Sequence, residues 1–165
     1  MRGRGIALLL AALVAVAACS RQGADQQAHP TDLVTRTSLG GIHLQDSRAT
    51  VERLYGPGRN LHRHGERAFH YSAGLTVYYD AGVKGGPVAL VEATSPRFHT
   101  ASGARLGGPA RAVRALGHME CGVVSKATAF SDRKVDCVTR AHGPGLMFDI
   151  VGGKVVYLAL VLRTN

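Results

Sequence analysis

One stretch decides the fold of this chain: Leu39-Gly40-Gly41-Ile42-His43-Leu44-Gln45-Asp46-Ser47-Arg48-Ala49-Thr50-Val51-Glu52-Arg53-Leu54-Tyr55-Gly56-Pro57. Ile42 and Leu44 alternate with polar residues, which predicts a short strand. Asp46 then offers a carboxylate that can cap the free N–H groups of a helix. The apolar residues of 48–55 share one helical face, and Gly56-Pro57 cannot continue the helix. We therefore predict a strand, a capped helix and a stop.

A fainter copy of this pattern returns at Ala104-Arg105-Leu106-Gly107-Gly108-Pro109-Ala110-Arg111-Ala112-Val113-Arg114-Ala115-Leu116-Gly117. Here Gly108 takes the cap position and Pro109 the first helical position, where the missing N–H costs nothing. Two solutions to the same capping problem at matching positions favour an internal duplication. The alternative is a chance match, because Gly and Ala are abundant in this chain.

Strand-like segments follow each predicted helix. They cover residues 67–71, 75–79 and 88–94 after the first helix, and 120–125, 135–140, 146–150 and 154–162 after the second. We therefore expect an α+β fold of two repeated units, about 38–98 and 99–165. Each unit is a short helix followed by antiparallel strands, with the helices packed on one face of an antiparallel sheet. Whether the two units share one sheet is left open.

The N-terminus has the pattern of a bacterial lipoprotein signal. Arg2 and Arg4 precede an apolar run over residues 6–18, and Val16-Ala17-Ala18-Cys19 fits a lipobox. We predict a signal peptide over 1–18, a lipidated Cys19, a flexible tether over 19–37 and a single domain over 38–165. An ordinary secretory signal with a chance Cys is the alternative. The prediction places the protein outside the cell membrane, anchored to its outer face.

Two further cysteines fit an exported protein. With Cys19 lipidated, Cys121 and Cys137 remain as a pair, and such pairs usually oxidise outside the cytoplasm. A bridge would close a loop of about 15 residues, worth roughly 3 kcal/mol. A metal site is the competing interpretation, but the close Cys-x-x-Cys spacing is missing. We predict the disulfide.

The formal net charge is +9, and Arg2 and Arg4 would leave with the signal peptide. A basic protein favours anionic neighbours, which outside the cytoplasm are lipid head groups, wall polymers or acidic protein surfaces. No Lys/Arg run of the kind that binds nucleic acid is present, so we expect no nucleic-acid partner. A solvated basic surface that aids solubility is the simpler alternative.

A family likeness enters with the lipobox and the pattern Gly-Ile-x-Leu-x-Asp-Ser-x-x-x-Val-x-x-Leu-x-Gly-Pro over residues 41–57. This pattern resembles the helix entry of small bacterial envelope lipoproteins of the outer-membrane-assembly type. It is also similar to the repeated units of the β-lactamase inhibitor protein. Both families have helices that precede an antiparallel sheet, and both act by binding other proteins. The chain departs from them in having one helix per unit and no Trp.

The resemblance and the composition together favour a non-enzymatic protein-binding or scaffold module of the cell envelope. Its partner would be an envelope protein, contacted through Arg97, Phe98 and Tyr78, because aromatic and arginine side chains are enriched at interfaces. The alternative for the linker 94–100 is that Phe98 fills the core.

A second functional hypothesis is a small-ligand or metal-binding envelope protein that uses His62, His64 and His70. On a strand, His62 and His64 point the same way and can share a metal. No carboxylate or Cys stands at ligand spacing, so a solvated basic loop is the competing interpretation. We expect no cofactor. We also expect no enzymatic activity, because the chain has no Gly-x-Ser-x-Gly elbow, no His-Glu-x-x-His and no phosphate loop with its Lys.

Overall fold

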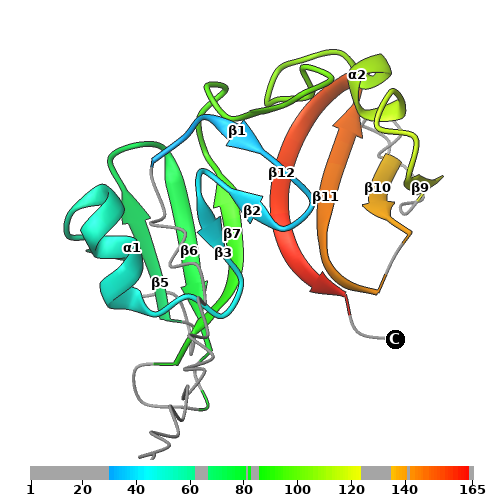
Figure 1. Cartoon of the computed structure of the whole chain (residues 1–165). Coiled ribbons are helices and arrows are strands. Elements are labelled where there is room, and N and C mark those ends of the chain that lie inside the picture. Colours follow the sequence, from blue (N-terminus) through cyan, green and yellow to red (C-terminus); the bar gives the residue numbers. More distant parts are fainter. Residues whose placement is uncertain are drawn as a thin grey trace, which may run out of the picture.

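The computed structural model of the chain describes residues 30–61, 67–80, 82, 86–123, 135–140 and 142–163. Strands account for 49% of these residues and helices for 12%, so β-structure dominates the fold (Figure 1). In chain order the elements are β1 (Leu33–Val34), β2 (Ser38–Leu39), β3 (Ile42–His43), α1 (Arg48–Tyr55), β4 (Arg59–Asn60), β5 (Arg67–Tyr71), β6 (Leu75–Tyr79), β7 (Val88–Ala93), β8 (His99–Thr100), α2 (Ala110–Arg114), β9 (Met119–Val123), β10 (Val135–Thr139), β11 (Gly143–Val151) and β12 (Lys154–Arg163).

The larger sheet has eight strands in the order β4-β5-β6-β7-β12-β11-β10-β9, and every neighbouring pair is antiparallel. Strands β4 to β7 form one meander and β9 to β12 form another. The two meanders meet where β7 pairs with β12, with Val91 opposite Leu160. Leu158, Ala159 and Leu160 of β12 are all fully buried. A continuous apolar run at the centre of a sheet, covered on both faces, explains that burial.

The smaller sheet has four strands in the order β3-β2-β1-β8. Strand β1 is antiparallel to β2 and parallel to β8. The sheet lies across one face of the larger sheet, between α1 and β12 (Figure 1). Its buried side chains Val34, Leu39 and Ile42 belong to the same core as residues from β6 and β12. Because residues 33 and 34 form β1, this part of the predicted tether belongs to the folded domain.

The predicted α+β class, with two repeated helix-then-strand units and helices covering one face of the sheet, is wrong. The described residues contain two helices, and α2 is only five residues long. The smaller sheet, rather than a pair of helices, supplies much of the second layer. Its strands have two residues each, which is too short for the alternation of apolar and polar residues to reveal them. The proposed division into units 38–98 and 99–165 remains a prediction.

Helix α1 starts one residue later than predicted. Its N-cap is Ser47, whose side chain accepts a hydrogen bond from the Thr50 N–H at 3.1 Å. The Asp46 carboxylate instead accepts from the His43 N–H at 2.8 Å and closes the turn before the helix. At the other end, Gly56 has φ 75° and its N–H donates to the Glu52 carbonyl, so the predicted glycine stop is confirmed.

Helix α2 is capped differently from α1. Pro109 occupies the N-cap, one residue later than the predicted cap Gly108, and no side chain accepts a hydrogen bond from the first turn. The Ala110 N–H donates instead to the Gly153 carbonyl at 2.9 Å, in the hairpin between β11 and β12. The larger sheet therefore supplies the acceptor that a capping side chain provides in α1.

Candidate functional site

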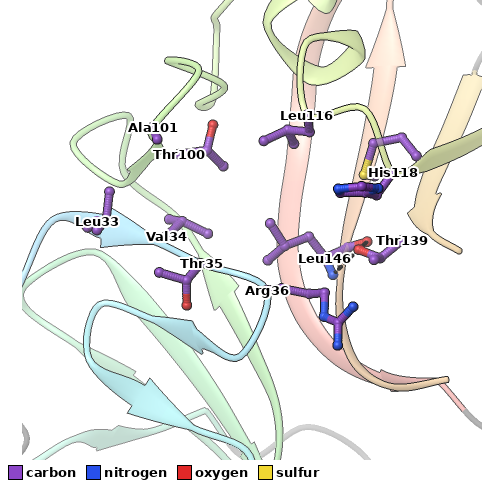
Figure 2. A pocket seen from close by; sticks show the side chains of 11 residues that line it. Leu33, Val34, Thr35, Arg36, Thr100, Ala101, Leu116, His118, Thr139 and Leu146 are labelled. Carbon is purple, nitrogen blue, oxygen red and sulfur yellow. Dashed lines mark hydrogen bonds between the residues drawn. The ribbon is translucent and has the colours of Figure 1, made fainter. Parts of the chain in front are cut away.

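An apolar cleft lies between the smaller sheet and the second meander, and Figure 2 shows the side chains around it. Its volume is about 270 Å³. Met119, Thr139 and Leu146 line it from neighbouring positions on β9, β10 and β11. The residues that line the other sides come from β1, the β1–β2 turn, β8 and the segment after α2: Leu33, Val34, Thr35, Arg36, Thr100, Ala101, Leu116 and His118. We refer to this cavity as the apolar cleft.

Three threonine hydroxyls in the walls of the apolar cleft already have hydrogen-bond partners within the protein. Thr139 Oγ1 accepts from the Leu146 N–H at 2.8 Å. Thr100 Oγ1 accepts from the Ala104 N–H, and Thr35 Oγ1 accepts from the Ser38 N–H, both at 3.0 Å. Because these hydroxyls are used, the walls offer an incoming group mainly apolar surface.

Arg36 and His118 are the two lining residues that carry basic side chains, and both are exposed. Within the described part of the chain, neither side chain forms a hydrogen bond or an ion pair. Other arginines differ: Arg48 pairs with Glu52, and Arg97 pairs with Asp32 through Nε at 2.7 Å. The apolar cleft therefore combines an apolar interior with two uncompensated basic groups.

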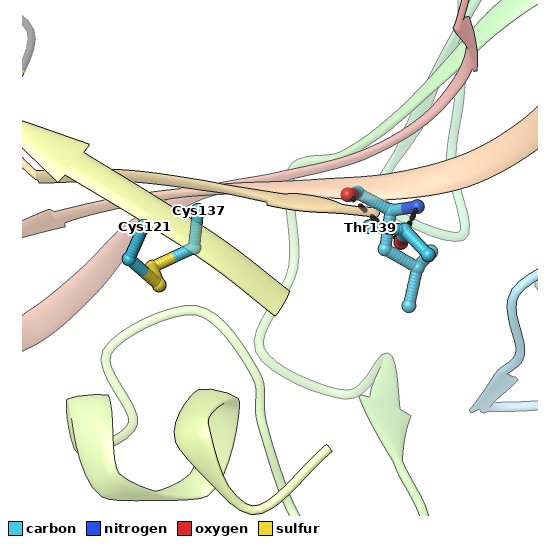
Figure 3. Close-up of a disulfide and its surroundings, with 4 residues drawn as sticks. Cys121, Cys137 and Thr139 are labelled. Carbon is cyan, nitrogen blue, oxygen red and sulfur yellow. Dashed lines mark hydrogen bonds between the residues drawn. A yellow bond between two sulfur atoms is a disulfide. The ribbon is translucent and has the colours of Figure 1, made fainter. Parts of the chain in front are cut away.

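The predicted disulfide is present and lies on the strands that line the apolar cleft. Cys121 on β9 and Cys137 on β10 are directly opposed, with Cα atoms 4.1 Å apart. Met119 and Thr139 are the opposed pair two residues further along the same strands. Figure 3 shows the bridge and Thr139 at separate places along β10. Within the described residues β9 has a partner strand on one side only. The bridge therefore ties an edge strand, and one wall of the apolar cleft, to the sheet.

The predicted partner-binding residues do not form one patch. Phe98 is fully buried in the core, as the alternative interpretation of the linker had it, and the Arg97 guanidinium lies 5.4 Å from its ring centroid. Tyr78 is half-buried on β6 and its hydroxyl donates to Glu92 at 3.0 Å. The role of Arg97 and Tyr78 in binding remains a prediction, whereas Phe98 has no exposed surface to offer.

Tyrosine phenols gather at two places in the sheet. The hydroxyls of Tyr71 and Tyr79 lie 2.8 Å apart in the core. Burial raises the pKa of both phenols. On β12, burial first and the neighbouring Glu92 next raise the pKa of Tyr157. These phenols are therefore neutral hydrogen-bonding groups at physiological pH rather than proton-transfer groups.

The described part of the structure contains no cluster of side chains that could form the hypothesised metal site. His62 and His64 lie outside the described residues, so the structure does not place them. His70 is half-buried on β5, and its Nδ1 lies 3.4 Å from Thr76 Oγ1. No group of three or more His, Cys, Asp or Glu side chains in the described ranges is arranged to hold a metal ion.

The predicted lipid anchor also falls outside the described residues, because Cys19 and the predicted signal peptide precede residue 30. Among the residues that the structure describes, no helix is both long and apolar enough to cross a membrane.

The apolar cleft was not predicted from the sequence. Its lining residues are scattered from Leu33 to Leu146 and come from two sheets. One signal was available: Leu33-Val34 is an apolar pair inside an otherwise polar stretch that was assigned to the tether. An apolar pair in such a stretch indicates a docked segment, because exposing it to water is unfavourable.

No protein-family model matches the chain, and no curated protein matches it by sequence. Among solved structures, the chain is similar to a DUF4309 family protein, YjgB, from Bacillus subtilis. The two sequences are 16% identical, the match covers 71% of this chain and 78% of that chain, and the TM-score is 0.45.

Proposed function

We propose that the protein is an exported lipoprotein, held at the outer face of a bacterial membrane by Cys19, that binds an envelope protein and catalyses no reaction. The lipobox and the tether-like segment after it support the anchoring. The apolar cleft is the observation that carries the binding role. It is open to solvent at Arg36 and His118, and its threonine hydroxyls are already hydrogen-bonded.

The size of the apolar cleft favours a protein, rather than a drug-sized small molecule, as the partner. Pockets for drug-sized ligands usually span about 300–1,000 Å³, and the apolar cleft has about 270 Å³. A volume of this size suits one or two apolar side chains presented by another protein. Burying such a side chain contributes about 1.5–3 kcal/mol, so the remaining affinity would come from contacts around the rim.

Site-specific photo-crosslinking tests the proposal in bacterial cells that carry the full chain. Benzoyl-phenylalanine is introduced at one of two positions. Ala101 is exposed and lines the apolar cleft, whereas Val156 on β12 is 54% exposed and does not line it. We expect an adduct with one protein from position 101 and none from position 156.

Matched substitutions decide whether the adduct depends on the apolar cleft. Leu33 lines it and is 41% exposed, whereas Leu162 does not line it and is 49% exposed. We expect Leu33→Glu to abolish the adduct and Leu162→Glu to leave it. Cys19→Ala should weaken it by releasing the protein from the membrane. Equal adducts from both positions, or an adduct indifferent to Leu33→Glu, would contradict the proposal.

A further inference from the structure

The charges around the apolar cleft are segregated by the geometry of the second meander. In a strand, successive side chains point to opposite faces of the sheet. Met119, Thr139 and Leu146 face the apolar cleft. Glu120 follows Met119 on β9, and Asp136 lies three positions before Thr139 on β10, so both have the opposite parity and lie on the other face.

The acidic residues nearer the N-terminus are engaged elsewhere. Asp32 is paired with Arg97 and Glu52 with Arg48, while Glu92 accepts a hydrogen bond from Tyr78. No carboxylate in the described part of the chain is paired with Arg36 or with the His118 ring. Arg36 thus gives the rim of the apolar cleft a positive charge whose counter-charge is not supplied by the described residues.

Arg36 and His118 both line the apolar cleft, and each offers hydrogen-bond donors to a bound anion. The guanidinium of an arginine presents a planar fork of donors that fits a carboxylate, and an imidazole adds a further N–H donor. Both residues are exposed, so they can contact a ligand whose apolar part lies between Val34 and Leu146. Opposite charge at the rim also speeds the encounter with an anionic partner.

We infer that the segment bound in the apolar cleft is a polypeptide with an apolar side chain next to a carboxylate, and that Arg36 and His118 hold this carboxylate. The inference rests on the proposed function, because it names the chemistry of the partner for the same site. The volume of about 270 Å³ suits side chains rather than the full acyl chain of a membrane lipid, and the competition experiment below distinguishes the polypeptide from a shorter fatty acid.

A pair of fluorescent probes separates the inference from the proposal on which it rests. N-phenyl-1-naphthylamine is neutral, and 8-anilinonaphthalene-1-sulfonate has the same aromatic body with one sulfonate, which stands in for the carboxylate. Both are titrated into the purified full chain. We expect the neutral probe to bind and to be lost in Leu33→Glu but not in Leu162→Glu. Failure of the neutral probe to bind at this site would sink the proposed function itself.

The charge preference is then measured as a ratio of dissociation constants. We expect the sulfonate probe to bind about two- to fivefold more tightly than the neutral one, since contacts between exposed charges are modest. Arg36→Gln should remove most of this advantage and leave the neutral probe unaffected. Arg59→Gln is the matched control, because Arg59 is exposed on β4, the opposite edge of the larger sheet. If the neutral probe binds but the sulfonate brings no advantage, the inference is wrong and the proposed function stands.

Competition identifies the class of ligand. The blocked peptides acetyl-Phe-Glu-Phe-amide and acetyl-Phe-Gln-Phe-amide are compared with decanoate as competitors of the sulfonate probe. We expect the glutamate peptide to compete more strongly than the glutamine peptide, and this difference to vanish in Arg36→Gln. Competition by decanoate without competition by the glutamate peptide would assign the site to a fatty acid and overturn the inference. Equal competition by the two peptides would overturn it as well.

Discussion

The hydroxyl of Thr139 on β10 takes the place of a backbone partner for Leu146 on β11. It accepts from the Leu146 N–H at 2.8 Å and lies 3.3 Å from the Leu146 carbonyl, to which it donates. The backbone pairing of these two strands ends with Val138 opposite Met147. The side chain thus extends the ladder by one residue where the strands begin to diverge, beside the apolar cleft.

Replacing Thr139 with Val tests this arrangement. The substitution keeps the shape but leaves the buried Leu146 N–H without its acceptor, which costs about 1–3 kcal/mol. We expect urea unfolding to report a loss of that size for Thr139→Val. Thr139→Ser keeps the hydroxyl, and we expect a smaller loss, about the 0.8 kcal/mol of one buried methyl group. A valine variant as stable as the serine variant would show that the hydroxyl is dispensable.

Gly40 allows the β2–β3 turn to approach α1. Its φ is +66°, and a Cβ there would meet the Tyr55 hydroxyl oxygen at 2.7 Å, although that hydroxyl donates to the Gly40 carbonyl in the native structure. Gly40→Ala should therefore combine backbone strain of about 1–2 kcal/mol with displacement of Tyr55. Gly103 is the matched control, since its φ is +80° and a Cβ would meet nothing within 4 Å. We expect thermal unfolding to show a clearly larger loss for Gly40→Ala than for Gly103→Ala; equal losses would argue against the contact.

The bridge between Cys121 and Cys137 should stabilise the protein by about 3 kcal/mol, the value for a closed loop of about 15 residues. We expect the double variant Cys121→Ala/Cys137→Ala to lose this amount in urea unfolding. A reducing agent should bring the unsubstituted protein to the stability of the double variant and leave the double variant unchanged. Removing the bridge should increase amide hydrogen exchange most in β9, the edge strand that the bridge ties to β10. Unchanged exchange in β9 would contradict the assigned role.

The paired phenols of Tyr71 and Tyr79 predict a loss of stability in alkali. Burial raises the pKa of both phenols above the ordinary value near 10. Above pH 10 the unfolded chain therefore releases these protons while the folded chain keeps them. Their contribution is complete below pH 10 and is lost as the pH rises further, by about 1.4 kcal/mol at pH 11 for Tyr79, whose pKa is raised furthest.

Urea unfolding at pH 8 and pH 11 measures this loss. We expect the difference between the two pH values to be smaller by about 1.4 kcal/mol in Tyr79→Phe than in the unsubstituted protein. Tyr55 and Tyr157 are present in both proteins, so their contributions to the loss of stability cancel in the comparison. An identical loss in both proteins would show that Tyr79 is not protected from titration.

Sequence reasoning succeeded where one segment carried its own signal. The alternation in Leu75–Tyr79 and the strand predicted over 154–162 identified β6 and β12, and the count of cysteines identified the disulfide between Cys121 and Cys137. It failed where stability comes from distant partners. A strand of two residues is too short to show an alternation of apolar and polar side chains. The strands β2 and β3 form because Leu39 and Ile42 are buried in the core of the folded protein.

The apolar cleft belongs to this second kind of feature. Val34 and Leu146 are more than a hundred positions apart, and they share a cavity only because the smaller sheet lies against the second meander. No local sequence pattern predicts that two residues so far apart in the chain line one cavity. The helix-on-sheet expectation failed for the same reason, since the layer covering the larger sheet comes from segments whose sequence resembles irregular turns.

The pairing of β12, the last strand of the second meander, with β7 of the first determines when this protein can fold. Residues 154–163 supply the strand that joins β7 to β11, so a ribosome must synthesise nearly the entire described chain before the sheet can close. Until then the first meander lacks its neighbour and exposes the apolar edge of Val91 and Leu90. For a polypeptide that we propose to be threaded across a membrane unfolded, this delay is useful: the incomplete chain has no finished sheet to block its passage.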